Sequence, residues 1–230
     1  MINRKLKYEP AYDQLSETIA EKVCDVIKTT TEQTISFDFE EPLEFTLILT
    51  VNRTNNFNPK RTTDFKNLPW ESLNYKNKGF AINSKSFIPD DVVPDIEIIV
   101  YVSEMLEPQG YHILYYKLVD DIRHEIEHLL QQGINQKPER IAKVNQSTKD
   151  KALSNYKYFL LANEIPAMVA GMYASSSAKG TSLDTEFEEY LQPFLEYDII
   201  NKQQFFKIMK SWLDFAKQLY PKLRLTNKYF

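Results

Sequence analysis

His124-Glu125-Ile126-Glu127-His128 is the stretch that says most about this protein. A helix places side chains four residues apart on the same face, so both histidines can reach a single metal ion. The chain contains only three histidines among its 230 residues, so this spacing around a glutamate rarely arises by chance. The H-E-x-x-H spacing therefore predicts a zinc-dependent hydrolase with Glu125 beside the two ligands.

The sequence around the motif predicts the helix that such a site needs. Residues 111–132 contain no proline or glycine, and Gly133 follows as a helix terminator. At about 100° per residue, both histidines project away from the apolar stripe of this helix and toward a cleft. That stripe recurs at three- and four-residue intervals in Tyr115, Leu118, Val119, Ile122, Ile126, Leu129 and Leu130. A surface helix with two chance histidines is the alternative.

A third protein ligand is also needed, and no histidine follows His128. We therefore expect a carboxylate. Glu164 is the best candidate because it is the one acidic residue in a strongly apolar stretch, residues 158–173. The separation leaves room for a loop and a return helix that runs antiparallel to the first. Pro166 predicts a kink or a helix start at this point.

Two alternatives to Glu164 as the third ligand stay open. Glu164 can be a partly exposed helix residue that pairs with a lysine. The third ligand can also come from a later acidic run, whose members are weaker candidates because such a run is usually solvated. These residues are Glu186, Glu188, Glu189, Glu196 and Asp198.

With these residues the chain resembles the zincin metallopeptidases, and among them the gluzincins, in which H-E-x-x-H on one helix is joined by a glutamate on a second. The resemblance covers residues 111–175 and implies that His124, His128 and Glu164 bind zinc and that Glu125 is the general base. Segments 122–128 and 164–171 are also similar to small H-E-x-E-H proteins encoded by tailed bacteriophages. Residues 1–100 carry no such resemblance.

The sequence departs from the thermolysin type at Ala167 and Met168, where a Ser-Asp pair would help to orient a ligand. Asp120 and Asp121 lie one turn before the histidines and are candidates to accept the second ring N–H of His124. An ordinary solvated carboxylate pair is the alternative.

The chemistry expected of this arrangement follows from the ligand count. Three protein ligands on tetrahedral zinc leave one position for water, whose pKa falls toward about 7. Glu125 would take the proton and pass it to the leaving amine, while a further donor holds the oxyanion. His112, Tyr173 and Tyr197 are the candidates for that donor, and the sequence does not choose among them.

Composition limits the class of protein. The chain is 43% hydrophobic and 13% aromatic, enough for one domain with a sheet-rich lobe, residues 1–110, and a helical part, residues 111–230. A net charge of −4 with interspersed signs predicts no nucleic-acid partner. The single cysteine, Cys24, excludes an intramolecular disulfide, and we expect a small core residue on an amphipathic helix.

No segment has the pattern of a secretion signal or a membrane span. We therefore expect a cytoplasmic protein, in a host cytoplasm or a virion if it is phage-encoded, with a polypeptide substrate and no membrane partner. With five glycines, the chain also lacks a phosphate-binding loop. The oligomeric state is not predicted.

The first half of the chain predicts a helix followed by strands. Residues 12–28 have a helical apolar stripe. Residues 33–39 and 43–52 alternate as strands, and the Glu40-Glu41-Pro42 turn predicts that they pair as a hairpin. Residues 53–78 are expected to form a polar surface excursion held by Trp70, and 80–82 a short strand.

The clearest strand, residues 95–103, directly precedes the motif helix. The zincin resemblance implies that it is an edge strand that binds an extended substrate, whereas an ordinary central strand is the alternative.

The second half predicts mainly helices. A polar connector at 135–149 precedes a helix over 153–174, and 175–180 reads as a linker. Thr181-Ser182-Leu183-Asp184 predicts a cap for a helix through Tyr190, kinked near Pro193. The last helix, 202–219, has a wide apolar face that predicts deep packing rather than a dimer surface.

Taken together, these features predict an α+β, zincin-like fold with a small mixed or antiparallel sheet in the first half, a helical second half and a cleft between them. The function expected is a zinc metallopeptidase that acts on an extended polypeptide. Glu125 favours catalysis, because a purely structural zinc site needs no base there. A phage structural or host-interaction protein with a non-catalytic zinc site, or a zinc hydrolase of non-peptide amides, stays open.

Overall fold

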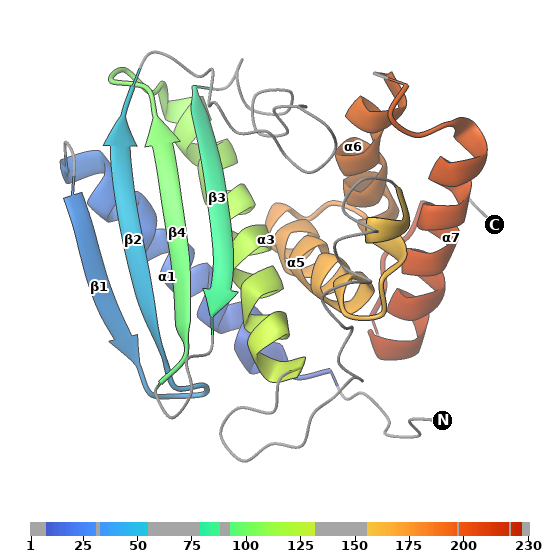
Figure 1. The fold of residues 1–230 in the computed structure, drawn as a ribbon, viewed down its shortest axis with the longest axis horizontal. Coiled ribbons are helices and arrows are strands. Elements are labelled where there is room, and N and C mark those ends of the chain that lie inside the picture. The colour runs from blue at the N-terminus through green and yellow to red at the C-terminus, as the bar shows by residue number, and fades with distance from the viewer. Residues whose placement is uncertain are drawn as a thin grey trace.

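The computed structural model describes residues 8–30, 33–54, 79–87, 93–131, 156–196, 198–220 and 222–226. Within these ranges the chain forms one four-stranded mixed sheet and five α-helices (Figure 1). The sheet belongs to the first half of the chain, and helices make up the second. This confirms the prediction of an α+β fold with a small sheet.

The sheet has the strand order β1-β2-β4-β3. Its strands are β1 (Gln33–Phe39), β2 (Phe45–Arg53), β3 (Phe80–Phe87) and β4 (Asp95–Val102). β1 and β2 pair antiparallel as the predicted hairpin, β2 and β4 pair parallel, and β3 and β4 pair antiparallel. β3 is longer than the short strand predicted at 80–82.

β4 is a central strand, which corrects the expectation of an edge strand directly before the motif helix. The reason is that β4 returns beside β2 in parallel, so the intervening strand β3 is left on the outside of the sheet. β3 is therefore the edge that adjoins the motif helix, and β1 forms the opposite edge (Figure 1).

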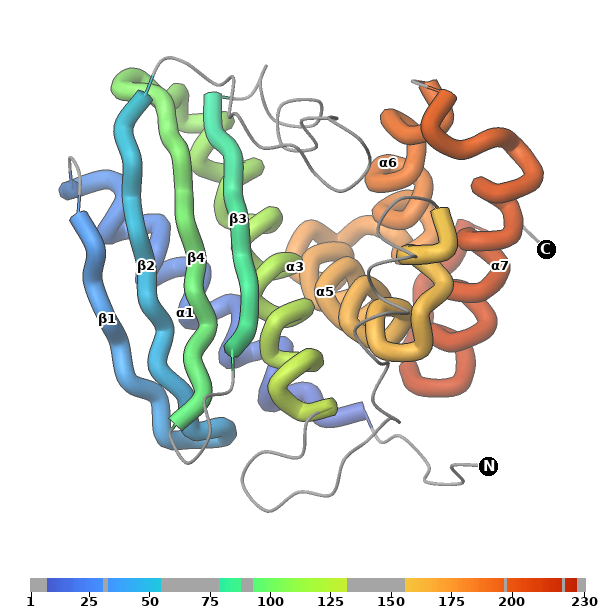
Figure 2. Tube along the Cα trace, in the orientation of Figure 1, coloured from blue at the N-terminus to red at the C-terminus, as the bar shows by residue number. Residues whose placement is uncertain are grey.

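Two helices cover one face of the sheet, α1 (Pro10–Thr29) and α3 (Pro108–Gln131) (Figures 1 and 2). Burial alternates along β2 and β4, as expected for strands with one face against a helical layer. Cys24 is buried on α1, and burial raises its pKa to about 11, so it is an inert core thiol as predicted. α3 confirms the predicted motif helix.

A second hydrophobic cluster lies on the side of α3 that faces away from the sheet (Figure 1). It is built from the 3-10 helix η2 (Tyr156–Leu160) and from α5 (Glu164–Lys179), α6 (Leu183–Glu196) and α7 (Lys202–Leu219). Trp212 of α7 is fully buried, and its indole N–H donates to the carbonyl of Phe159 at 2.9 Å. Most of the wide apolar face of α7 is therefore packed inside the protein, as predicted, although Phe206 is exposed.

The second half also corrects three predicted boundaries. In the described part of 153–174 the structure has two helices instead of the one predicted, because residues 161–163 are not helical and α5 begins at Glu164. A helix start near Pro166 is one of the two outcomes that the sequence predicts. The linker predicted at 175–180 is the last part of α5, which stops at Gly180 with a positive φ of 73°. α6 continues past Pro193 to Glu196, because Leu191 and Phe194 anchor it in the core.

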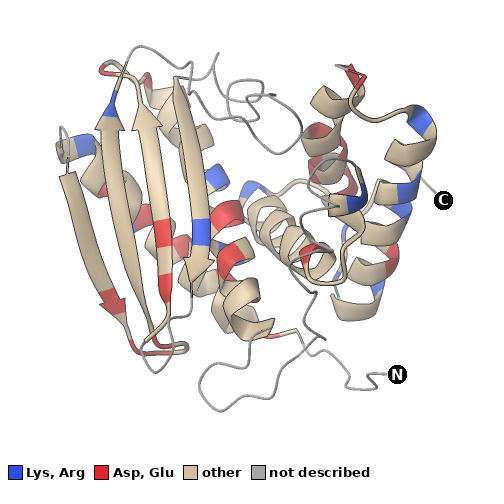
Figure 3. Ribbon diagram, viewed as in Figure 1, with Lys and Arg blue, Asp and Glu red and all other residues tan. Residues whose placement is uncertain are grey.

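The charged residues of α6 are acidic and those of α7 are mainly basic, while α3 carries both signs, so neither sign dominates the described helices (Figure 3). None of those helices combines the length and the apolar character that crossing a bilayer requires. The predicted excursion beyond Thr54 with Trp70, the connector at 135–149 and the stop at Gly133 fall outside the described residues.

Candidate metal centre

The structure brings together the three predicted ligands, His124, His128 and Glu164. The histidines lie one turn apart on α3, and Glu164 is the first residue of α5. The two imidazole Nε2 atoms are 3.0 Å apart, and Glu164 Oε2 lies 3.5 Å from Nε2 of His128 and 3.8 Å from that of His124. Within the described part of the chain this is the one cluster of His, Cys, Asp and Glu with metal-ligand geometry.

These separations suit a small tetrahedral ion. Ligands about 2.0–2.1 Å from such an ion lie about 3.3–3.4 Å from one another, which is within a few tenths of an ångström of the three measured separations. The side chains of His124 and His128 are 15% and 16% exposed, and that of Glu164 is 4% exposed, so the site is shielded but reachable. Two nitrogens and one carboxylate are also a donor set that zinc accepts.

Electrostatics favour a neutral imidazole at one ligand and a charged carboxylate at another. Burial, together with the neighbouring His128, lowers the pKa of His124 to about 3. Burial alone raises the pKa of Glu164, but contacts with His128, His124 and Tyr158 outweigh it and lower the pKa to about 2. Burial lowers the pKa of His128, whereas its contact with Glu164 raises it, and the net shift is upward.

Glu164 is held by two donors rather than by a lysine. The Tyr158 hydroxyl donates to Oε2 at 2.9 Å, and the Asn163 amide donates to Oε1 at 2.6 Å. Among the rival acids, Glu186 accepts hydrogen bonds from Lys179 and Thr181, at the opposite end of α5 from Glu164. Within the described residues, the alternative in which Glu164 pairs with a lysine is therefore wrong.

Glu125 follows His124 in the chain and lies near enough to His128 and Glu164 for both to affect its pKa, but it is not one of the three clustered residues. Its side chain faces the edge strand, where the Ser84 hydroxyl donates to Oε1 at 2.9 Å and Ser86 adds a second hydrogen bond. Burial raises the pKa of Glu125, against the opposing effects of His128 and the two serines. A carboxyl with a raised pKa beside a metal site is suited to accept a proton near neutral pH.

Asp120 and Asp121, the predicted acceptors for the second ring N–H of His124, contact Lys117 instead. Lys117 lies 2.7 Å from a carboxylate oxygen of Asp120 and 2.7 Å from one of Asp121, and in the described structure neither acid hydrogen-bonds to His124. The single ammonium of Lys117 can balance only one of the two carboxylate charges, and burial raises the pKa of Asp121 to about 7. His128, by contrast, has its second ring nitrogen 3.4 Å from Oε1 of Gln131.

Two of the three predicted oxyanion donors lie away from the ligands. His112 is exposed near the start of α3, against the ring of Tyr116, and Tyr173 stacks on Tyr220 in the second cluster. The third, Tyr197, is outside the described residues. The tyrosine that does reach the site is Tyr158, which sequence reasoning missed because no helical spacing relates it to Glu164 across the break at 161–163.

The opposite side of α3 explains the second glutamate of the motif. Glu127 is buried and lies 3.0 Å from the guanidinium of Arg123, which also reaches Asp13 of α1 at 2.9 Å. Tyr8 completes the group by donating to Asp13 at 2.9 Å. Glu127 thus helps to fix the rotation of α3, so that the two histidines face α5.

Gly171 allows α3 and α5 to approach closely. A Cβ at this position would lie 2.5 Å from the carbonyl oxygen of Asp120, which is closer than real atoms come, and would also meet the Asp120 side chain. Gly171 lies beside Asp120, whereas Glu164, earlier on α5, lies beside His128, so the helices run antiparallel as predicted. The close approach helps to bring Glu164 within reach of the histidines.

Replacement of Gly171 by alanine should push the two helices apart. We expect a loss of about 1–3 kcal/mol in the free energy of unfolding, as for other overpacked sites, together with weaker zinc binding. Chemical denaturation and a zinc titration measure the two effects. Ser177→Ala, on the exposed side of α5, is the control and should change neither. Unchanged zinc affinity in Gly171→Ala would show that the helix separation does not set the ligand geometry.

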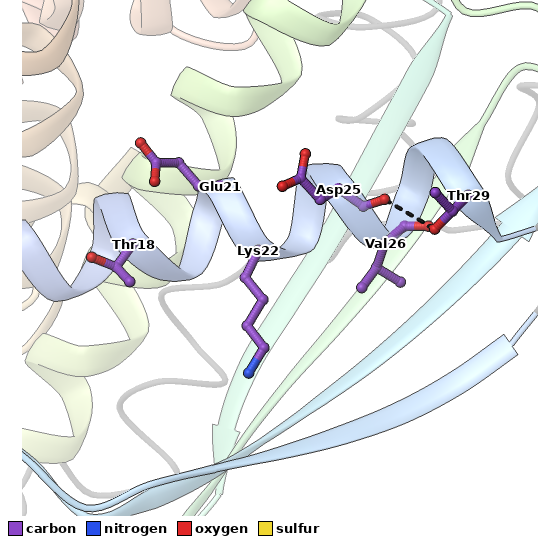
Figure 4. A pocket seen from close by; sticks show the side chains of 6 residues that line it. All are labelled: Thr18, Glu21, Lys22, Asp25, Val26 and Thr29. Atoms are coloured by element: carbon purple, nitrogen blue, oxygen red, sulfur yellow. Dashed lines mark hydrogen bonds between the residues drawn. The ribbon is translucent and has the colours of Figure 1, made fainter.

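A hollow lies on the surface of α1 (Figure 4). All of its lining residues come from this one helix: Thr18, Glu21, Lys22, Asp25, Val26 and Thr29. The hydroxyls of Thr18 and Thr29 donate to carbonyls of their own helix, and Asp25 pairs with Lys28. The hollow therefore presents no convergent ligands.

Comparisons of this protein with protein-family models, with curated proteins and with solved structures find no match. The candidate metal centre therefore rests on its own geometry.

Proposed function

We propose that this protein is a zinc-dependent metallopeptidase that hydrolyses peptide bonds in an extended polypeptide. The observation that carries the proposal is the convergence of His124, His128 and Glu164 on one point, with Glu125 beside them and held on the edge strand. A purely structural zinc site needs no carboxyl in that position.

Each residue has a distinct part in this proposal. When bound, zinc acts as a Lewis acid and lowers the pKa of the attacking water toward about 7. Glu125 takes a proton from that water and then delivers it to the leaving amine. Tyr158 and Asn163 orient the carboxylate of Glu164, and Ser84 orients that of Glu125.

The edge strand β3 supports a peptide as the substrate. The Ser103 N–H donates to the Gly79 carbonyl at 2.8 Å, which identifies the hydrogen-bonded positions of the β3–β4 pair. Because these positions alternate along an antiparallel pair, Ile82, Ser84 and Ser86 direct their own N–H and C=O groups away from β4. No described strand pairs with that edge.

Serines at the same positions hold the proposed base. Ser84 and Ser86 hydrogen-bond to Glu125 through their hydroxyls, while their backbone groups face outward along the edge. A peptide that adds to β3 by β-augmentation therefore passes beside Glu125 and the metal ligands. This arrangement favours hydrolysis of a peptide over a compact non-peptide amide, which would not use the edge.

The proposal is tested by metal analysis and by digestion of casein or a peptide library. We expect about one zinc per chain and hydrolysis that a chelator abolishes and added zinc restores. A zinc-loaded protein that cleaves no peptide would shift the assignment to a phage structural or host-interaction protein with a non-catalytic zinc site.

A further inference from the structure

We propose that Gln131 sets the tautomer of His128 that is able to bind metal. The inference rests on the proposed metal site, but the tautomer itself is a property of the metal-free protein. Gln131 is the last residue of α3, buried and three positions after His128 on the same side of the helix. Its amide contacts Nδ1 of His128 and the carbonyl of Asn163.

The direction of the Gln131 amide follows from its other hydrogen bond. Nε2 of Gln131 lies 2.8 Å from the backbone carbonyl oxygen of Asn163. A carbonyl only accepts, so the NH2 end of the amide must face Asn163 and the oxygen must face His128. Reversal of the amide would place two oxygens against each other.

The protonation of His128 follows in turn. Oε1 of Gln131 lies 3.4 Å from Nδ1 of His128 and can only accept, so this contact favours a hydrogen on Nδ1. It competes with the carboxylate of Glu164, which lies 3.5 Å from Nε2 of the same ring. In the neutral ring this leaves a lone pair on Nε2, which is the atom that faces Glu164 and His124. Only this form of the ring has a metal-binding electron pair at that point.

The same chain of contacts joins two ligands on different helices. Asn163, whose carbonyl receives Gln131, also donates through its side chain to Oε1 of Glu164 at 2.6 Å. His128, Gln131, Asn163 and Glu164 therefore form a continuous path from α3 to α5. We infer that this path holds both ligands in place before the metal arrives, which reduces the free energy spent on ordering them.

The direct test reads the tautomer by NMR of 15N-labelled histidine in the metal-free protein. Because contact with Glu164 raises the pKa of His128, the spectra are followed to high pH until the His128 shifts stop changing. The ring is then neutral, and its two nitrogen shifts show which nitrogen is protonated. We expect the Nδ1–H form for His128 in the wild type and the Nε2–H form in Gln131→Met, a variant of similar length that keeps neither hydrogen bond. Zinc affinity of that variant should fall about 10- to 100-fold.

Gln131→Glu separates tautomer control from a simple link between helices. A carboxylate still accepts from Nδ1–H but cannot donate to Asn163. We expect Gln131→Glu to keep the Nδ1–H form and to bind zinc more tightly than Gln131→Met does. If Gln131 acts only by tying α3 to α5, then Gln131→Glu should lose zinc affinity to the same extent as Gln131→Met. Gln218→Met, on the exposed face of α7, is the surface control.

An Nε2–H form of His128 in the wild type, or an unchanged Nδ1–H form in Gln131→Met, would overturn the inference. The wild-type measurement decides the matter even if a variant fails to fold. The NMR measurement uses neither metal nor substrate, so its result is independent of peptidase activity. A protein that shows the expected tautomers and hydrolyses no peptide would contradict the peptidase proposal and still support the role of Gln131.

Discussion

Replacement of Glu125 by glutamine is expected to lower peptide hydrolysis by about 10²- to 10⁴-fold, the usual contribution of a positioned general base. Zinc content and melting temperature should stay near those of the wild type, because Glu125 lies beside the ligands and is not one of them. Glutamine also keeps the shape of the side chain and still accepts from Ser84. Initial rates on a casein or peptide substrate, with metal analysis of the same sample, measure both quantities.

Glu127→Gln is the matched control, because it makes the same chemical change two residues away on the other side of α3. There the glutamine weakens the buried ion pair with Arg123, so we expect a loss of about 1–3 kcal/mol in the free energy of unfolding. The folded fraction should retain zinc and most of its activity. Glu125→Gln should thus lower turnover and leave stability unchanged, whereas Glu127→Gln should lower stability and leave most of the turnover.

Activity that survives Glu125→Gln would contradict the assignment of the base. If that activity also survives a chelator, the hydrolysis comes from another site or from a contaminant. Loss of zinc in Glu125→Gln would instead show that the carboxylate is needed to bind the metal, which the described geometry does not predict.

The second large effect is expected from the ligands themselves. His124→Ala and His128→Ala each remove one of three protein donors, so each should abolish stoichiometric zinc binding and all zinc-dependent hydrolysis. Equilibrium dialysis followed by elemental analysis gives the bound zinc per chain. Far-ultraviolet circular dichroism confirms that the variant compared with the wild type is folded.

His112→Ala controls for the general effect of removing a histidine from this helix. His112 is the one histidine of the chain that is not a proposed ligand, and it is exposed near the start of α3, about three turns before His124. Its replacement should leave zinc content and activity unchanged. Full zinc occupancy in a double variant of His124 and His128 would show that the metal binds elsewhere.

Patterns local in the sequence were enough to predict much of this protein. The H-E-x-x-H spacing, the absence of helix breakers and the apolar stripe predict α3, because helical periodicity depends only on neighbouring residues. Alternation likewise predicts the β1–β2 hairpin. Glu164 was identified as a candidate ligand because a lone carboxylate among apolar residues needs a partner, and the structure places it at the histidines.

Other features depend on residues that meet only after folding. The strand at 95–103 reads the same whether it is central or at an edge, and its place was settled by the parallel return beside β2. The polar run Ser175-Ser176-Ser177 reads as a linker, yet Ser175 and Ser176 are buried because α5 packs between α3 and the outer helices. Packing of neighbouring elements here outweighs local propensity.

The groups around the ligands were the least accessible to sequence reasoning. Gln131 meets Asn163 across 32 positions, Ser84 meets Glu125 across 41, and Arg123 meets Asp13 across 110. No periodicity relates such pairs, because their contact depends on how the helices and the sheet pack. The sequence by itself therefore determined the motif helix and the candidate ligands, whereas the tertiary structure alone decided which side chains orient them, since hydrogen bonds between distant segments exist only once the core has placed those segments together.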